Sequence, residues 1–228
     1  MKRWSFDRKR RSEGRPPLGP EENFINHFHK LYYESDEKTW KNTFWLGIPA
    51  QKCPLDLWIY QEIIFETKPG IIIETGTANG GSALFLATIC DLSGKGEVIT
   101  IDIESRENKP EHPRIKYFLG SSTSKAIVEG VQSFVRGKDG IMVILDSDHN
   151  REHVLKELEI YSKFVTRGGY LIVEDTNLNG YPVEPDFGPG PMEAVEEFLG
   201  TNKDFMIDKS REKFYLTFNP NGYLKRTK

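Results

Sequence analysis

The stretch IIIETGTANGGSALFLA, Ile71–Ala87, decides the fold of this chain. An apolar run ends at Glu74, a loop carries Gly76, Gly80 and Gly81, and apolar residues then return with helical spacing. Glycines let a backbone turn sharply and approach a ligand closely. The pattern therefore predicts a buried strand, a ligand-holding loop and a helix, in that order.

The same alternation of strand-like runs and helical patterns continues to the end of the chain. Apolar runs this continuous, separated by helices, are typical of strands buried on both faces of a parallel sheet. The last two runs lie close in sequence, so one of them is expected to be antiparallel. The predicted strands are EVITID (97–102), IKYFLG (115–120), IMVILD (141–146), GGYLIVED (168–175), DFMID (204–208) and KFYLTF (213–218), and the later helices are 123–136, 151–165 and 191–199.

These elements predict an α/β fold with a Rossmann-like, doubly wound and mostly parallel sheet that includes a terminal antiparallel strand. Three parts are expected along the chain: a basic flexible tail at 1–20, an N-terminal helical segment at 21–68, and a ligand-binding domain at 69–228. Ligands of such sheets bind beyond the carboxyl ends of the strands, where the strand order reverses.

Composition and charge exclude several classes of protein. The net charge is −3, which makes no case for nucleic acid as the main partner. No apolar run approaches the roughly 18 residues of a membrane span, and the N-terminus has no apolar signal region. Cys53 and Cys90 fit thiols of a reducing compartment. The expectation is a soluble, cytoplasmic protein without a membrane partner.

The tail differs in charge from the rest of the chain. It carries seven cations, namely Lys2, Arg3, Arg8, Lys9, Arg10, Arg11 and Arg15. Such a segment is either a solvated tail or a binder of polyanions.

The glycine loop favours an adenosyl ligand with a positive charge. Its spacing is G-x-x-x-G-G, which differs from the G-x-G-x-x-G of dinucleotide sites. Glu74 stands directly before the turn, where it would repel a pyrophosphate but attract a sulfonium and an amino group. Asp102 ends the next strand and is suited to accept hydrogen bonds from ribose hydroxyls. The loop is therefore predicted to hold S-adenosylmethionine (SAM); the alternative is a tight turn without a ligand.

Three carboxylates follow two strands that are expected to be neighbours. Asp146 ends one of them, and Glu174 and Asp175 end the other. Three oxygen ligands at adjacent strand ends suit Mg²⁺ or a similar hard cation. In the alternative, Asp148 or Asn150 caps the following helix and the other acids face solvent.

Two further features lie close to these acids. His149 and His153 are four residues apart, but H-N-R-E-H is not the H-E-x-x-H of zinc sites. His149 could stack on a ligand or take a proton, or simply begin a helix. The Pro- and Gly-rich loop 180–191, with Tyr181 and Phe187, is either a lid or a stiff connection.

Several segments together resemble the family named after cephalosporin hydroxylase, which has the fold of SAM-dependent methyltransferases. They are IETGTANGGSALFLA, LDSDHNREHVLKEL, GGYLIVEDTN, GPGPMEAVEEFL and LTFNPNGYLKR. The resemblance covers about Trp40 to Arg226 and leaves residues 1–39 outside.

The resemblance implies a role for each site residue. It assigns Glu74, Gly76, Ala78, Gly80 and Ser82 to the SAM loop, Asp102 to the ribose, Ser121 and Ser122 to the adenine, Asp146, Glu174 and Asp175 to the metal, and His149 with Asp146 to catalysis. Related enzymes often carry Asp-Asn where this chain has Glu-Asp, and use a lysine as base where DSDHN has none. His149 is the substitute candidate for that base.

The sequence thus predicts a SAM-dependent, Mg²⁺-assisted O-methyltransferase that acts on a hydroxyl of a small molecule, either a sugar or a natural product. One alternative is a hydroxylase of a small metabolite, although an iron site of that kind needs two histidines and one carboxylate. Another is a SAM- or RNA-binding module that uses the basic tail. The oligomeric state, including a homo-oligomer, is left open.

Overall fold

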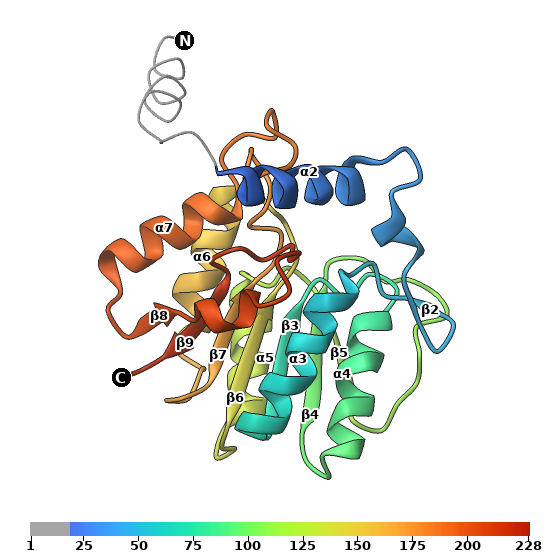
Figure 1. The fold of residues 1–228 in the computed structure, drawn as a ribbon. Helices are drawn as coiled ribbons and strands as arrows, with labels where there is room; N and C mark the ends of the chain where they lie inside the picture. Colours follow the sequence, from blue (N-terminus) through green and yellow to red (C-terminus); the bar gives the residue numbers. More distant parts are fainter. Residues whose placement is uncertain (1–18) are drawn as a thin grey trace.

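The computed structural model describes residues 19–228. The predicted tail, 1–20, lies outside the described residues except for its last two positions. The structure is built around a seven-stranded sheet with the strand order β5-β4-β3-β6-β7-β9-β8 (Figure 1). Its strands are β3 (Ile71–Thr75), β4 (Glu97–Asp102), β5 (Ile115–Leu119), β6 (Ile141–Leu145), β7 (Tyr170–Val173), β8 (Phe205–Ile207) and β9 (Tyr223–Arg226).

The pairing confirms the predicted fold class. Strands β3 to β7 are parallel to one another, and β9 pairs antiparallel with both β7 and β8. The order reverses between β3 and β6, which places the ligand-binding edge at the ends of these two strands.

Helices cover both faces of the sheet because its central strands are apolar on both sides. Ile71 and Ile73 pack into a cluster on one face, and Ile72 packs into a cluster on the other. The first face is covered by α5 (Lys125–Val135), α6 (Arg151–Tyr161) and α7 (Pro191–Thr201), and the second by α3 (Pro54–Thr67) and α4 (Gly81–Leu92).

The predicted last strand was wrong. Residues 213–218 form no strand; the place beside β7 is taken instead by β9, ten residues further on. Tyr223 and Leu224 in β9 are fully buried and belong to the clusters on opposite faces, as a strand inside a sheet requires. Leu216 and Phe218 in the predicted run pack into a third cluster, away from the sheet pairing.

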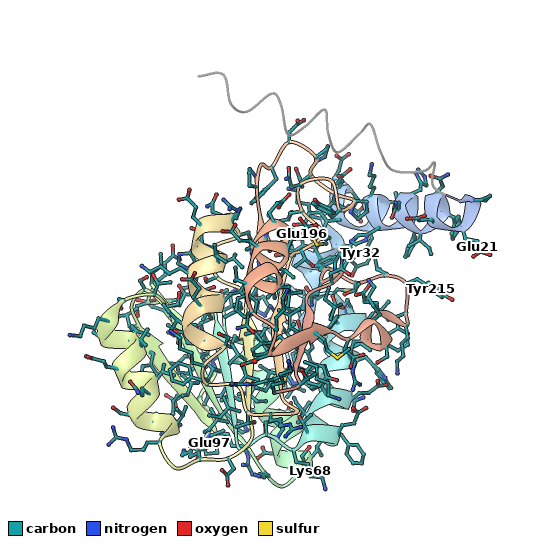
Figure 2. All side chains as sticks on the ribbon, turned by 90° about the vertical axis from the view of Figure 1, so that its left-hand side faces the viewer. Glu21, Tyr32, Lys68, Glu97, Glu196 and Tyr215 are labelled. Atoms are coloured by element: carbon teal, nitrogen blue, oxygen red, sulfur yellow. The ribbon has the colours of Figure 1, made fainter. Side chains whose placement is uncertain are left out.

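The N-terminal segment closes the carboxyl end of the sheet. It contains α2 (Pro20–Glu34), a short 3-10 helix (Thr39–Asn42) and the two-residue strands β1 (Phe44–Trp45) and β2 (Ile48–Pro49). Helix α2 lies across the top of the molecule in Figure 1, beside the loop that follows β7. Figure 2 shows that the outer end of α2, at Glu21, projects beyond the rest of the molecule. Tyr32, near the other end of the helix, lies close to the rest of the molecule.

Two predictions from composition can be compared with the described residues. Cys53 and Cys90 are both buried free thiols. Among the helices within residues 19–228, none has the length and apolar character needed to cross a membrane.

Candidate active site

A cavity of about 970 Å³ opens at the carboxyl ends of the central strands. At one end it is lined by the glycine loop and the ends of β4 and β5, including Gly76, Ala78 and Asp102. At the other it is bounded by Tyr33 and Phe187. Its size lies within the range of small-molecule sites in proteins.

Two glycines of the loop have backbones that other residues would strain. Gly76 has φ +89°, and a Cβ atom there would lie 1.8 Å from the carbonyl oxygen of Asp146. Gly80, with φ +81°, is the N-cap of α4, and a Cβ atom there would lie 2.9 Å from Pro110 Cδ. Since neither position accepts a side chain, the loop stays open toward the cavity.

Asp102 is held at the cavity wall by the backbone around it. Its Oδ2 accepts a hydrogen bond from the Ala78 N–H at 2.9 Å, and its Oδ1 accepts one from the Glu104 N–H at 2.9 Å. Each carboxylate oxygen can accept further bonds, so a vicinal diol such as ribose fits this position.

The other predicted SAM residues divide into two groups. Ala78, Ser82, Ser121 and Ser122 line the cavity together with Gly76 and Asp102, whereas Glu74 and Gly80 do not. Glu74 is fully buried behind the loop, where Thr100 donates to its Oε2 at 2.6 Å. Burial raises the pKa of Glu74. The predicted contact of Glu74 with SAM stays a prediction.

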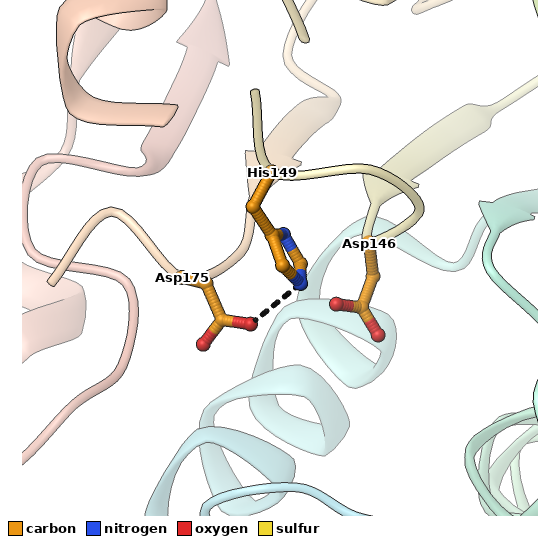
Figure 3. A group of neighbouring side chains, drawn as sticks. All are labelled: Asp146, His149 and Asp175. Atoms are coloured by element: carbon orange, nitrogen blue, oxygen red, sulfur yellow. Dashed lines mark ion pairs between the residues drawn. The ribbon is translucent and has the colours of Figure 1, made fainter. Parts of the chain in front are cut away.

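Three predicted residues meet at the ends of β6 and β7. Asp146, His149 and Asp175 each offer one ligand atom, and these atoms lie within 4.8 Å of one another (Figure 3). His149 Nε2 is 3.1 Å from Asp175 Oδ2. Asp175 has φ +55°, a costly conformation for a residue with a Cβ atom. Two carboxylates and one imidazole form a donor set that fits a divalent cation.

Glu174 is not part of this group of three. Its Oε1 accepts a hydrogen bond from the Tyr60 hydroxyl at 2.9 Å and lies 2.7 Å from Lys52 Nζ. Lys52 Nζ also donates to Oδ2 of Asp146. Burial raises the pKa of both Asp146 and Glu174. The structure thus joins Glu174 to the other predicted ligands through a lysine that the sequence analysis missed.

His153 takes no part in this group, although it follows His149 by one helical turn. Its Nε2 is 3.4 Å from Glu157 Oε1 and within 3.3 Å of the Ser122 and Ser147 hydroxyls. The hydrogen bond with Glu157 raises the pKa of His153. The two histidines therefore do not form a shared metal site.

Several contacts hold the loop after β7 in place. Val183 is fully buried in the third cluster, and the Glu184 N–H donates to Glu34 Oε1 of α2 at 2.9 Å. Phe187 is 43% exposed and lines the cavity. Tyr181 is not among the lining residues. Glu184 of the same loop also lines the cavity, and the lid stays a prediction.

Comparisons with solved structures agree with this fold. Two structures of CmcI, one without ligand and one with Mg and SAM, superpose with a TM-score of 0.64 each. The first is 20% identical and spans 94% of this chain and 87% of that one; the second is 21% identical and spans 100% and 87%.

Closer relatives are found by sequence. The Rhamnosyl O-methyltransferase of Mycobacterium leprae (strain TN) is 41% identical over 91% of this chain and 92% of its own length. That of Mycobacterium tuberculosis (strain ATCC 25618 / H37Rv) is 40% identical over 91% and 86%. Residues 37–227 match the family described as Rhamnosyl O-methyltransferase/CmcI. The resemblance and the enzyme class predicted from the sequence are confirmed, and the chain belongs to the Rhamnosyl O-methyltransferase/CmcI family of methyltransferases.

Proposed function

We propose that this chain transfers the methyl group of SAM to a hydroxyl oxygen of a sugar, in particular a rhamnosyl unit. The observation that carries the proposal is a single cavity with a diol-binding carboxylate at one end and an acid–imidazole group beyond it. The name of the relatives at 40–41% identity supports the sugar.

The cofactor would lie along the glycine loop. Gly76 and Ala78 offer backbone at the cavity wall, Asp102 would accept hydrogen bonds from the ribose hydroxyls, and Ser121 and Ser122 would border the adenine. This arrangement would direct the sulfonium toward the ends of β3 and β6, which Asp146 directly follows.

The acid group would hold the metal. Asp146 and Asp175 face one another, and the contacts of Glu174 fall on Oε1, which would leave its other oxygen to a cation. When bound, Mg²⁺ supplies a Lewis acid that lowers the pKa of the acceptor hydroxyl.

His149 would take the proton of that hydroxyl. Its imidazole lies 3.1 Å from the Asp175 carboxylate, which stabilises the imidazolium once the proton has arrived. The hydroxyl oxygen forms a bond with the methyl carbon while the bond from that carbon to sulfur breaks, and the electron pair stays on sulfur. Holding the two reactants in line supplies on the order of 7–11 kcal/mol of the barrier.

The N-terminal segment would complete the acceptor end. Tyr33 and Trp40 stack with ring centroids 5.4 Å apart and both line the cavity. An aromatic surface of this kind suits the apolar face of a sugar ring. A cytoplasmic location is part of the proposal and is supported by the two free thiols.

The test uses SAM with a trideuterated methyl group and a panel of rhamnosides, with products weighed by mass spectrometry. The expected product gains one trideuteromethyl group on oxygen, and an excess of chelator abolishes its formation. A product that gains one oxygen atom instead would support the hydroxylase alternative. If none of the rhamnosides is methylated, the proposed acceptor is wrong.

A further inference from the structure

A buried lysine stands behind the acid group. Lys52 is only 3% exposed, and its ammonium lies between the carboxylates of Asp146 and Glu174. It is not among the residues that line the cavity. Lys52 therefore cannot touch the acceptor and acts on the site only through its two partners.

The position of Lys52 follows from the start of α3. Lys52, Asp56 and Tyr60 are spaced by four residues, so they lie along one side of the segment that enters and begins the helix. Asp56 accepts from the Thr217 hydroxyl at 2.5 Å and from the Phe218 N–H at 2.8 Å. These hydrogen bonds hold the start of α3 in place, and Lys52 lies just before this start.

Lys52 belongs to a hydrogen-bonded network that reaches the third acid. The Tyr60 hydroxyl donates to Glu174 and accepts from Asn219 Nδ2, both at 2.9 Å. Asn219 Oδ1 accepts in turn from the Asp175 N–H at 3.2 Å. Lys52 itself contacts one oxygen of Asp146 and one of Glu174.

Charge explains why a lysine is needed there. Asp146, Glu174 and Asp175 lie together in a buried region, where uncompensated like charges are costly. The ammonium reduces their summed charge from −3 to −2, and a divalent cation would then bring it to zero.

We propose that Lys52 is a built-in cation of the metal site: a positioning residue that compensates the charges of Asp146 and Glu174 while no metal is bound. It holds one oxygen of each carboxylate and leaves the second oxygen of each to the incoming ion. The part that concerns the ion rests on the proposed function. The part that concerns the metal-free protein does not.

The first test compares Lys52→Met with the wild type in chelator, by thermal unfolding. Removing one partner of a buried ion pair leaves uncompensated carboxylates, so the melting temperature should fall by about 10 °C. Lys138→Met is the matched control, because Lys138 pairs with Glu97 at the surface and its loss should cost little. Equal melting temperatures of wild type and Lys52→Met would overturn the proposal.

The second test titrates the same proteins with Mn²⁺ alone, by calorimetry. A fixed ammonium repels a divalent ion bound to the same carboxylates, so Lys52→Met should bind Mn²⁺ at least about tenfold more tightly than wild type. Mn²⁺ should also restore most of the lost melting temperature. Unchanged or weaker Mn²⁺ binding by a folded Lys52→Met protein would contradict the proposal.

A double variant keeps the proposal testable if Lys52→Met does not fold. Lys52→Met with Glu174→Gln removes one charge of each sign, so its metal-free melting temperature should exceed that of Lys52→Met. A double variant no more stable than the single one would overturn the proposal. None of these measurements uses an acceptor, so a protein that behaves as expected here but methylates nothing would fail the proposed function alone.

Discussion

The two ends of the cavity are built in different ways. The cofactor end is made by the carboxyl ends of parallel strands, where β3 pairs with β4 and β6 in regular register. The acceptor end is made by α2, the 3-10 helix and the loop after β7, which are far apart in sequence. They are joined by an apolar cluster that includes Tyr33, Leu178 and Val183, and by hydrogen bonds such as those from the Glu184 N–H to Glu34 and between Asn177 and His29.

This difference separates what each end can control. Sheet geometry places the glycine loop and Asp102, so changes there should alter SAM binding and leave acceptor recognition intact. Tertiary contacts between segments place Tyr33 and Phe187, so changes there should alter acceptor recognition alone. Asp146 lies between the two ends. Its loss should therefore stop methyl transfer without distinguishing the contribution of one end from that of the other.

Asp146→Asn is expected to have the largest effect. It removes one of the carboxylate charges that face the site, so turnover should fall roughly a thousandfold, while SAM affinity changes by less than about threefold. Steady-state kinetics and calorimetry with SAM provide the two measurements. Asp139→Asn, an exposed acid at the opposite end of the sheet, is the control. Full methyl transfer by Asp146→Asn would break the assignment of the metal site.

Asp102→Ala should give the next largest effect, on the cofactor end. The loss of two hydrogen bonds to a charged acceptor costs about 3 kcal/mol or more, which corresponds to roughly a hundredfold weaker SAM binding. The KM for the acceptor should stay within about twofold of wild type. An unchanged dissociation constant for SAM would show that the ribose lies elsewhere.

Phe187→Ala should test the acceptor end separately from the cofactor end. The ring lines the cavity and is half-exposed, so its loss should raise the acceptor KM about tenfold and leave SAM affinity unchanged. Phe65→Ala, on an exposed face of α3, is the control. Equal damage to SAM and acceptor binding would mean that the loop has a structural role only.

The smallest effect concerns the attachment of α2. Burial lowers the pKa of His29 to about 4, and its Nε2 accepts a hydrogen bond from Asn177 at 3.0 Å. Because a neutral imidazole is favoured in the fold, its contribution to stability is complete above pH 6.5 and is lost as the pH falls from about 6.5 through about 4.

His29→Gln should therefore flatten the dependence of the melting temperature on pH in that window, whereas His27→Gln, at an exposed position, should not. Equal slopes for wild type and His29→Gln would contradict a buried neutral His29.

Local patterns were enough to predict the strands, the glycine loop and the acids at this end of the cavity. Strand periodicity, the glycine spacing and the acids at strand ends lie within short windows, and a parallel sheet brings such ends together in a known way. The same logic brought Asp146 and Asp175 together. It could not show that the Glu174 carboxylate contacts Tyr60 and Lys52, because these partners lie far away in the sequence.

Long-range contacts account for what the sequence did not reveal. Lys52 is 94 residues from Asp146, and nothing in the run QKCP marks it as a site residue. The run 213–218 has the composition of a strand, but β9 takes the place beside β7. There Gly222 allows close approach, since a Cβ atom would lie 2.2 Å from the Val173 carbonyl oxygen.

Anomalous diffraction from crystals grown with Mn²⁺ and S-adenosylhomocysteine tests the central claim most directly, because it locates metal and cofactor in one cavity. The account predicts one strong manganese peak within coordination distance of Asp146 and Asp175, together with ribose hydroxyls on the Asp102 carboxylate. A fully occupied cofactor without a peak at these acids, or a ribose away from Asp102, would contradict it.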